Sequence, residues 1–160
     1  MNFNHFDDQG QAIMVDVSGK QPTLRTATAR ATVQLGLALL QNVLSGGSAK
    51  GDVLGVARLA GIAAAKKTAE LIPLSHPLAI HHAAIDFRSA PESGKIEVMA
   101  TVRAYERTGV EMEAMVAASI AALTIYDMCK GSDKGIAIGE VILLYKDGGK
   151  SGTYRREEER

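Results

Sequence analysis

The stretch RTATARATVQL, residues 25–35, alternates small apolar side chains with polar ones. A period of two is typical of a β-strand that buries one face and leaves the other face to solvent. We therefore predict a half-buried strand here. The elements on either side of it decide the fold.

Helical patterns follow this strand. Residues 37–44 are predicted to form a short helix, which a Gly- and Ser-rich turn closes. Asp52 is a suitable N-cap for a long second helix, and Pro73 must end that helix. Two glycines and several alanines within it leave a narrow surface. This composition predicts close packing on a sheet or on a partner helix.

The second half of the chain reads as a hairpin, a helix and a strand. Residues 83–88 and 96–104 alternate on either side of a turn, which predicts a β-hairpin. Residues 111–130 have helical spacing and an apolar middle, so we expect that middle to be buried on all sides. The last strand, residues 136–145, changes phase at Gly139-Glu140. A β-bulge at that point explains the change.

Without the short first helix, the order of elements is β-α-β-β-α-β. This is the split βαβ arrangement of a ferredoxin-like α+β sandwich with an antiparallel sheet. We expect residues 1–160 to form a single domain. Residues 1–20 form a polar N-terminal segment, and residues 147–160 are expected to be a flexible charged C-terminal tail.

Charge and composition exclude several classes of function. The 160 residues carry 18 basic and 18 acidic side chains, which argues against a nucleic-acid-binding protein. The N-terminus lacks the pattern of a signal peptide. The longest mostly apolar run, residues 114–126, is shorter than the roughly 18–20 residues of a membrane span. The single cysteine, Cys129, excludes an internal disulfide. We expect a cytoplasmic protein that binds neither nucleic acid nor membranes.

Two motifs suggest sites that closer inspection does not support. Gly149-Lys150-Ser151 is similar to the end of a phosphate-binding P-loop, but that motif requires a glycine at the position of Leu144. Three histidines lie between residues 76 and 82, without the ligand spacing of a zinc site. We therefore expect no P-loop and no metal. His76 lies between two prolines that stiffen its loop.

The predicted helix 111–130 carries charged residues at both ends. Asp127 has the unfavourable sign for the negative end of the helix dipole. Either it pairs with Lys130, three residues further on, or it serves acid–base chemistry. Other lysines recur at the ends of elements, which fits a site for a polyanionic small molecule. These are Lys50, Lys66, Lys67, Lys134, Lys146 and Lys150.

Long blocks of the sequence also resemble a known family. The blocks are residues 14–18, 50–54, 60–62, 65–69, 71–78, 108–114, 121–130 and 148–152. In order and extent they resemble the molybdenum cofactor biosynthesis protein C family, the cyclic pyranopterin monophosphate synthases. The resemblance covers nearly the whole chain.

This resemblance implies a ferredoxin-like fold and a homohexamer, built as a trimer of dimers with sites between subunits. The implied reaction converts 3′,8-cyclo-7,8-dihydroguanosine 5′-triphosphate to cyclic pyranopterin monophosphate and releases diphosphate. The reaction needs acids and bases but no redox cofactor, and we expect no cofactor. The family's catalytic residues fall on Lys50, Asp127 and Lys130. Its substrate-binding residues fall on Leu74, Ser75, His76, Met112 and Glu113.

Ser75 departs from the family, in which a cysteine commonly stands before His-Pro. A serine resembles cysteine in size and hydrogen bonding, so we interpret this position as one that serves binding or shape. Two other classes of function stay open. One is a module that binds a nucleotide without converting it, and the other is an oligomerisation domain whose helix-end charges only pair.

The implied site residues lie far apart on one predicted helix. Glu113 and Asp127 are separated by about 21 Å along a helix with its ordinary rise per residue. They project to the same side, at opposite ends. A two-fold axis that packs the helix antiparallel to its copy brings Glu113 of one chain near Asp127 of the next. We therefore predict that two chains share each active site.

Overall fold

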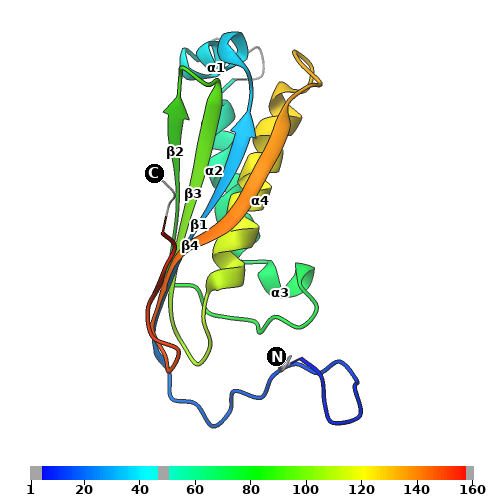
Figure 1. Ribbon diagram of the computed structural model, residues 1–160, viewed down its shortest axis with the longest axis vertical. Helices are drawn as coiled ribbons and strands as arrows, with labels where there is room; N and C mark the ends of the chain where they lie inside the picture. Colours follow the sequence, from blue (N-terminus) through cyan, green and yellow to red (C-terminus); the bar gives the residue numbers. More distant parts are fainter. Residues whose placement is uncertain (1–4, 47–50, 158–160) are drawn as a thin grey trace.

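The strand predicted around residues 25–35 lies inside the sheet as β1, Thr23–Gln34. The computed structural model describes residues 5–46 and 51–157. Its sheet has the strand order β2-β3-β1-β4-β5 (Figure 1). All neighbouring strands run antiparallel. The predicted ferredoxin-like α+β fold is confirmed.

The elements follow the predicted order with two additions. The strands after β1 are β2 (His82–Ala90), β3 (Lys95–Glu106), β4 (Ala137–Asp147) and β5 (Tyr154–Arg155). The helices are α1 (Leu37–Leu44), α2 (Val53–Ala65), α3 (Thr68–Leu71) and α4 (Glu111–Cys129). The sequence does not predict β5, which lies within the segment expected to be a flexible tail. It pairs with Tyr145 and Lys146 of β4.

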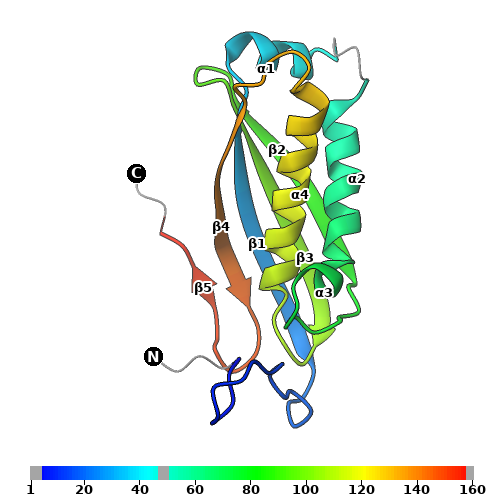
Figure 2. The ribbon, with the colours of Figure 1, turned by 90° about the vertical axis from the view of Figure 1, so that its right-hand side faces the viewer.

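Small side chains bring the helical layer close to the sheet. Figure 2 shows α2 and α4 side by side on one face of the sheet. The contact includes fully buried alanines of β1 and α4, namely Ala27, Ala29, Ala31, Ala117, Ala118 and Ala121. A Cβ atom at Gly61 of α2 would lie 3.0 Å from the carbonyl oxygen of Ala117. The predicted close packing of the second helix is thus confirmed.

The second helix is shorter than predicted. It ends at Ala65 and does not continue toward Pro73; the short helix α3 follows it. The hydroxyl of Thr68 donates a hydrogen bond to the carbonyl oxygen of Ala65 over 3.0 Å. The N–H of Lys67 donates to the carbonyl oxygen of Ala64, also over 3.0 Å. These two bonds close the helix with a tight turn, and apolar periodicity does not reveal such competition for backbone carbonyls.

Two local predictions are confirmed. Asp52 caps α2, since its side chain accepts a hydrogen bond of 2.8 Å from the N–H of Gly55. The β1–β4 register shifts by one residue where Gly139-Glu140 stands opposite Thr32, which is the expected bulge. A second shift, near Leu144, is not predicted by the sequence.

The prediction that the middle of α4 is buried on all sides is wrong within this chain. Leu123, on the outer face of the helix, is 52% exposed. By length and composition α4 could cross a membrane. Its burial accounts for that composition, because Ala117 and Ile125 are fully buried in the core beside the sheet. The apolar run is therefore the central helix of the fold.

Candidate active site

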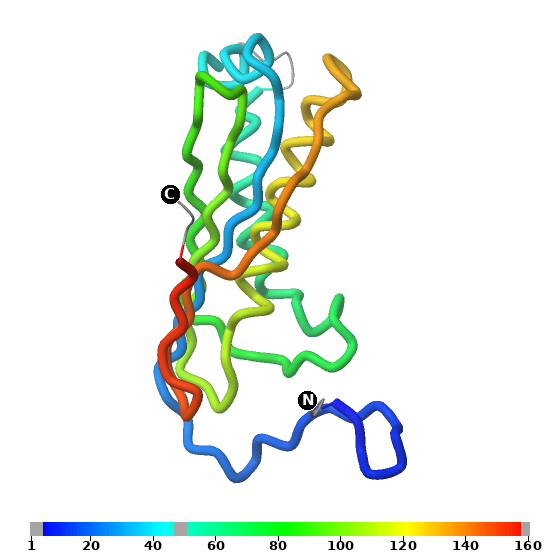
Figure 3. Tube along the Cα trace, in the orientation of Figure 1, coloured from blue at the N-terminus to red at the C-terminus, as the bar shows by residue number. Residues whose placement is uncertain are grey.

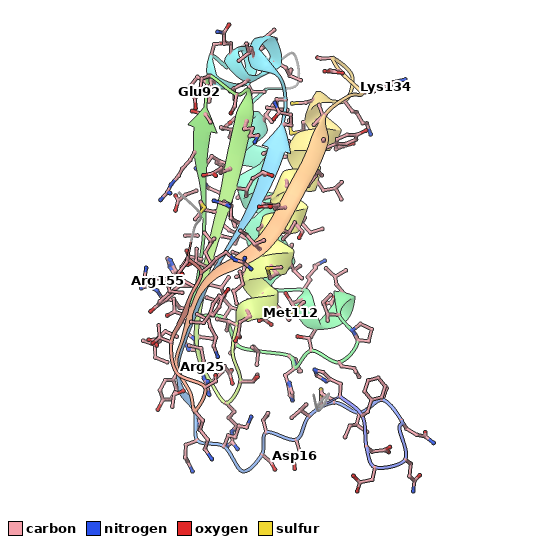
Figure 4. The ribbon with its side chains drawn as sticks, viewed as in Figure 1. Asp16, Arg25, Glu92, Met112, Lys134 and Arg155 are labelled. Atoms are coloured by element: carbon pink, nitrogen blue, oxygen red, sulfur yellow. The ribbon has the colours of Figure 1, made fainter. Side chains whose placement is uncertain are left out.

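A cavity of about 640 Å³ lies at the N-terminal end of α4. The loop after α3 forms one wall, the first turn of α4 forms another, and the N-terminal segment closes a third side. Figure 4 shows Met112 at this end of the helix. All the residues expected to bind substrate line this cavity: Leu74, Ser75, His76, Met112 and Glu113. The fold brings two segments together here that are distant in the sequence.

Glu113 is the buried acid of this cavity. Glu113 is only 2% exposed, and this burial raises the pKa of its carboxyl group to about 7. The nearby carboxylate of Glu111 raises this pKa further, while a hydrogen bond from the backbone N–H of Glu113 itself opposes the rise. A carboxyl group with such a pKa exchanges protons near neutral pH. Glu113 is therefore suited to acid–base chemistry.

A second cavity of about 740 Å³ adjoins the first. The two cavities share the side chains of Lys20, Thr108 and Glu111. The second cavity is strongly cationic, because Glu111 is its only acid among the described residues. Its basic residues are Lys20, Arg25, Arg107, Lys146 and Lys150. In a chain with equal numbers of acidic and basic side chains, this concentration of positive charge makes the second cavity a candidate anion site.

The wall of the second cavity is built around Arg25. The guanidinium group donates hydrogen bonds of 3.2 Å to the carbonyl oxygens of Glu106 and Arg107. A glycine loop lies directly against it, since a Cβ atom at Gly149 would come 1.7 Å from Nη1 of Arg25. Gly148 and Gly149 both have positive φ angles. Gly148 and Gly149, the second of which belongs to the incomplete P-loop motif, thus let the chain pass close to a buried arginine.

Sequence reasoning missed Arg25 as a site residue, although a signal was present. Arg25 lies in the same phase of β1 as the buried residues Ala27 and Ala29, and it is itself only 8% exposed. A charged residue on the core-facing side of a strand needs polar partners there. Lys20 and Arg107 offered no such signal, because each lies in a loop.

Asp127 and Lys130 lie at the other end of α4, away from both cavities. Nζ of Lys130 donates a hydrogen bond of 2.5 Å to Oδ1 of Asp127. This bond and the negative charge of Asp127 raise the pKa of the Lys130 amino group. Within one chain, the two residues form an ion pair on an exposed surface, which is one of the two alternatives that the sequence left open. The pairing leaves a chemical role for Asp127 open.

The predicted residues fall into two groups, and one chain does not bring these groups together. The substrate-binding set lies at the N-terminal end of α4, and Asp127 and Lys130 lie at its C-terminal end. Lys50 lies outside the described residues. Of the other lysines, Lys146 and Lys150 line the cationic cavity, whereas Figure 4 shows Lys134 at the far end of the molecule.

The raised pKa of Glu113 predicts a stability effect that depends on pH. Below pH 4.5 the carboxyl group is protonated in both the folded and the unfolded chain. Between pH 4.5 and 7 the unfolded chain releases this proton first, so folding stability falls as the pH rises. At pH 8, Glu113→Gln should therefore raise the free energy of unfolding by up to about 3 kcal/mol. Urea unfolding across this pH range measures the difference.

The matched control is Glu92→Gln, which removes an exposed carboxyl group from the β2–β3 turn (Figure 4). We expect it to change stability by less than about 0.5 kcal/mol at every pH. A Glu113→Gln effect that is equally large at pH 4 and pH 8 would contradict the assigned cause.

Comparison with known proteins assigns the chain to a family. Residues 14–149 match the model of the MoaC family. The chain is 78% identical over its full length, and over all of the relative's, to the cyclic pyranopterin monophosphate synthase of Geotalea uraniireducens. It is 75% identical to that of Geobacter metallireducens, with 99% of each chain covered. It is 55% identical to that of Chloroflexus aggregans, with 97% of this chain and 94% of the relative covered. The chain therefore belongs to the MoaC family.

Proposed function

We propose that this protein is a cyclic pyranopterin monophosphate synthase. It is a lyase that converts 3′,8-cyclo-7,8-dihydroguanosine 5′-triphosphate to cyclic pyranopterin monophosphate and diphosphate, in molybdenum cofactor biosynthesis. One observation carries the proposal: a cavity with a buried acid and an imidazole adjoins a cationic cavity. A nucleoside triphosphate has these two parts, a heterocycle with N–H groups and a polyanionic tail.

In this proposal, each cavity binds a different part of the substrate. The purine-derived part binds in the first cavity, beside Glu113 and His76. The phosphates bind in the second cavity, where Lys20, Lys146 and Lys150 neutralise their charge. Release of diphosphate leaves negative charge on the departing group, and a fixed cluster of cations stabilises this charge as it develops.

The chemical step needs proton transfer at the part of the substrate that rearranges. We assign Asp127 as the base and Lys130 as the group that donates a proton or neutralises charge. Lys50 is assigned as a further catalytic cation. The pairing with Asp127 raises the pKa of the Lys130 amino group and so favours its protonated form, which the role of proton donor or cation requires.

A complete site then needs two chains, because the two groups of residues lie at opposite ends of α4. We propose a homohexamer built as a trimer of dimers. The outer faces of α2 and α4 offer apolar surface for such contacts: Val56 is 45% exposed, Leu59 70% and Leu123 52%. We also place the enzyme in the cytoplasm, because its substrate derives from a nucleoside triphosphate.

The alternative is a module of this fold that holds the nucleotide without converting it. An assay for diphosphate separates the two functions. The enzyme releases diphosphate from the cyclised nucleotide, whereas a binding module is stabilised by the nucleotide and releases none.

Removal of the proposed base or cation should abolish turnover. We expect Asp127→Asn and Lys130→Met each to lower kcat by at least about 100-fold, the usual contribution of a general acid or base. Asp133→Asn is the control, since it alters an exposed carboxylate a few residues beyond α4 and should leave kcat unchanged. Near wild-type diphosphate release from either site variant at saturating substrate would refute the role assigned to that residue.

Loss of charge in the cationic cavity should weaken binding of phosphates specifically. Lys150→Met is expected to raise the Kd of inorganic diphosphate about three- to tenfold, as removal of one exposed charge contact does. Lys134→Met removes a lysine at the other end of the molecule and should leave this Kd unchanged. Titration calorimetry at low and high salt measures both variants, and equal effects would show that net charge alone governs binding.

A mixing experiment tests the shared site. Chains with Glu113→Gln and chains with Asp127→Asn are each expected to be inactive alone. After the subunits exchange, a shared site regenerates some pockets in which both residues are intact, and part of the activity returns. Mass spectrometry of differently labelled chains verifies the exchange. If exchange is complete and no activity returns, each chain forms its own site.

A further inference from the structure

The N-terminal segment contributes a wall to the first cavity. We call residues 15–18 the strap. Figure 3 shows the chain running below the loop between α3 and β2 before it enters β1. The strap alternates like a strand: Val15 and Val17 are half-buried and line the cavity, whereas Asp16 is exposed (Figure 4). Its apolar side chains thus face the space in which the substrate is proposed to bind.

Contacts with distant parts of the fold hold both ends of the strap. At one end, Nε2 of His76 lies 2.7 Å from the carbonyl oxygen of Val15. At the other end, Nη1 of Arg107 donates a hydrogen bond to the carbonyl oxygen of Ser18. Between them, Oδ1 of Asp16 accepts a hydrogen bond of 2.8 Å from the N–H of Ser18. The strap therefore has a defined conformation against the cavity.

The contact with Val15 decides which nitrogen of His76 carries the proton. A backbone carbonyl oxygen only accepts hydrogen bonds, so Nε2 must be the donor. In a neutral imidazole the other nitrogen, Nδ1, then has a free lone pair and acts as an acceptor. Within residues 5–46 and 51–157, no protein group donates a hydrogen bond to Nδ1 of His76. That acceptor is available to a ligand in the cavity.

We propose that the strap is a positioning element of the active site. The carbonyl oxygen of Val15 holds His76 as the Nε2–H tautomer, and Nδ1 accepts a hydrogen bond from an N–H group of the substrate's heterocycle. The identity of that ligand rests on the proposed function, whereas the tautomer does not. A guanine-derived ring carries N–H donors on its edge, which match this acceptor.

The test compares two aspartates that cap turns of the same segment. Asp16→Ala removes the acceptor that shapes the strap. Asp7→Ala is the matched control: Asp7 accepts hydrogen bonds from the N–H groups of Gln9 and Gln11, outside the cavity. A second pair of variants deletes residues 1–17, which removes Val15, or residues 1–12, which leaves it in place.

The first measurement is the ¹⁵N chemical shift of the two imidazole nitrogens of His76. It is made on histidine-labelled protein at alkaline pH, and the shifts themselves report which ring nitrogen carries a proton. His76→Gln assigns the signals. We expect a protonated Nε2 and an unprotonated Nδ1 in the wild type, the Asp7→Ala variant and the shorter deletion. We expect a mixture of tautomers in the Asp16→Ala variant and the longer deletion.

The second measurement is turnover of the cyclised nucleotide. Loss of the fixed acceptor should raise KM about three- to tenfold, the effect of one neutral hydrogen bond, with kcat unchanged. A proton on Nδ1 in the wild type would overturn the proposal, and so would identical shifts and KM in the two deletion variants. If the protein releases no diphosphate at all, the proposed function fails, but the nitrogen shifts still test the tautomer.

Discussion

The close contact of α4 with β1 is the constraint on which the rest of the structure depends. Both surfaces carry alanines where they meet, among them Ala29 and Ala118, which are fully buried. Small side chains let the helix and the sheet approach closely without voids. Gly61 has the same effect on the neighbouring helix, because a Cβ atom there would come within 3.0 Å of the carbonyl oxygen of Ala117 and crowd the contact. These contacts hold α4 in place as the central helix of the fold.

Helix α4 carries proposed site residues at both of its ends, so these residues form two separate groups. At its N-terminus, burial turns Glu113 into a group that exchanges protons near neutral pH. At its C-terminus, Asp127 and Lys130 are exposed and form an ion pair, which raises the pKa of the Lys130 amino group. The length of α4 prevents these groups from meeting within one chain. This separation is the physical basis of the proposal that two subunits complete each site.

The end of the molecule near Glu113 consists of loops that pack against α4 and the sheet. The strap, the glycine loop at residues 148–149 and the loop after α3 have few regular hydrogen bonds of their own. Specific side chains fasten them instead: Arg25 lies against the glycine loop, and His76 and Arg107 hold the strap. The same cations and the same imidazole face the two cavities. Ordering of the loops and binding of the substrate therefore depend on shared residues.

Local patterns in the sequence determined the elements and their order. The alternation around Ala27, the cap at Asp52 and the bulge at Gly139-Glu140 each depend on a few neighbouring residues, so periodicity and residue type sufficed. The end of α2 was misplaced because the hydroxyl of Thr68 competes for a backbone carbonyl, which a hydrophobic pattern does not record. The family resemblance supplied the candidate site residues, but not their arrangement.

Only the tertiary structure decided how those residues act. The contact between His76 and Val15 joins positions 61 residues apart, and the cationic cavity draws on residues 19–25, 107–111 and 146–151, which are distant in the sequence. The pKa of Glu113 reflects burial by neighbours from other segments. Burial, charge and hydrogen-bond partners depend on which distant segments pack together, and that is settled only when the whole core is formed.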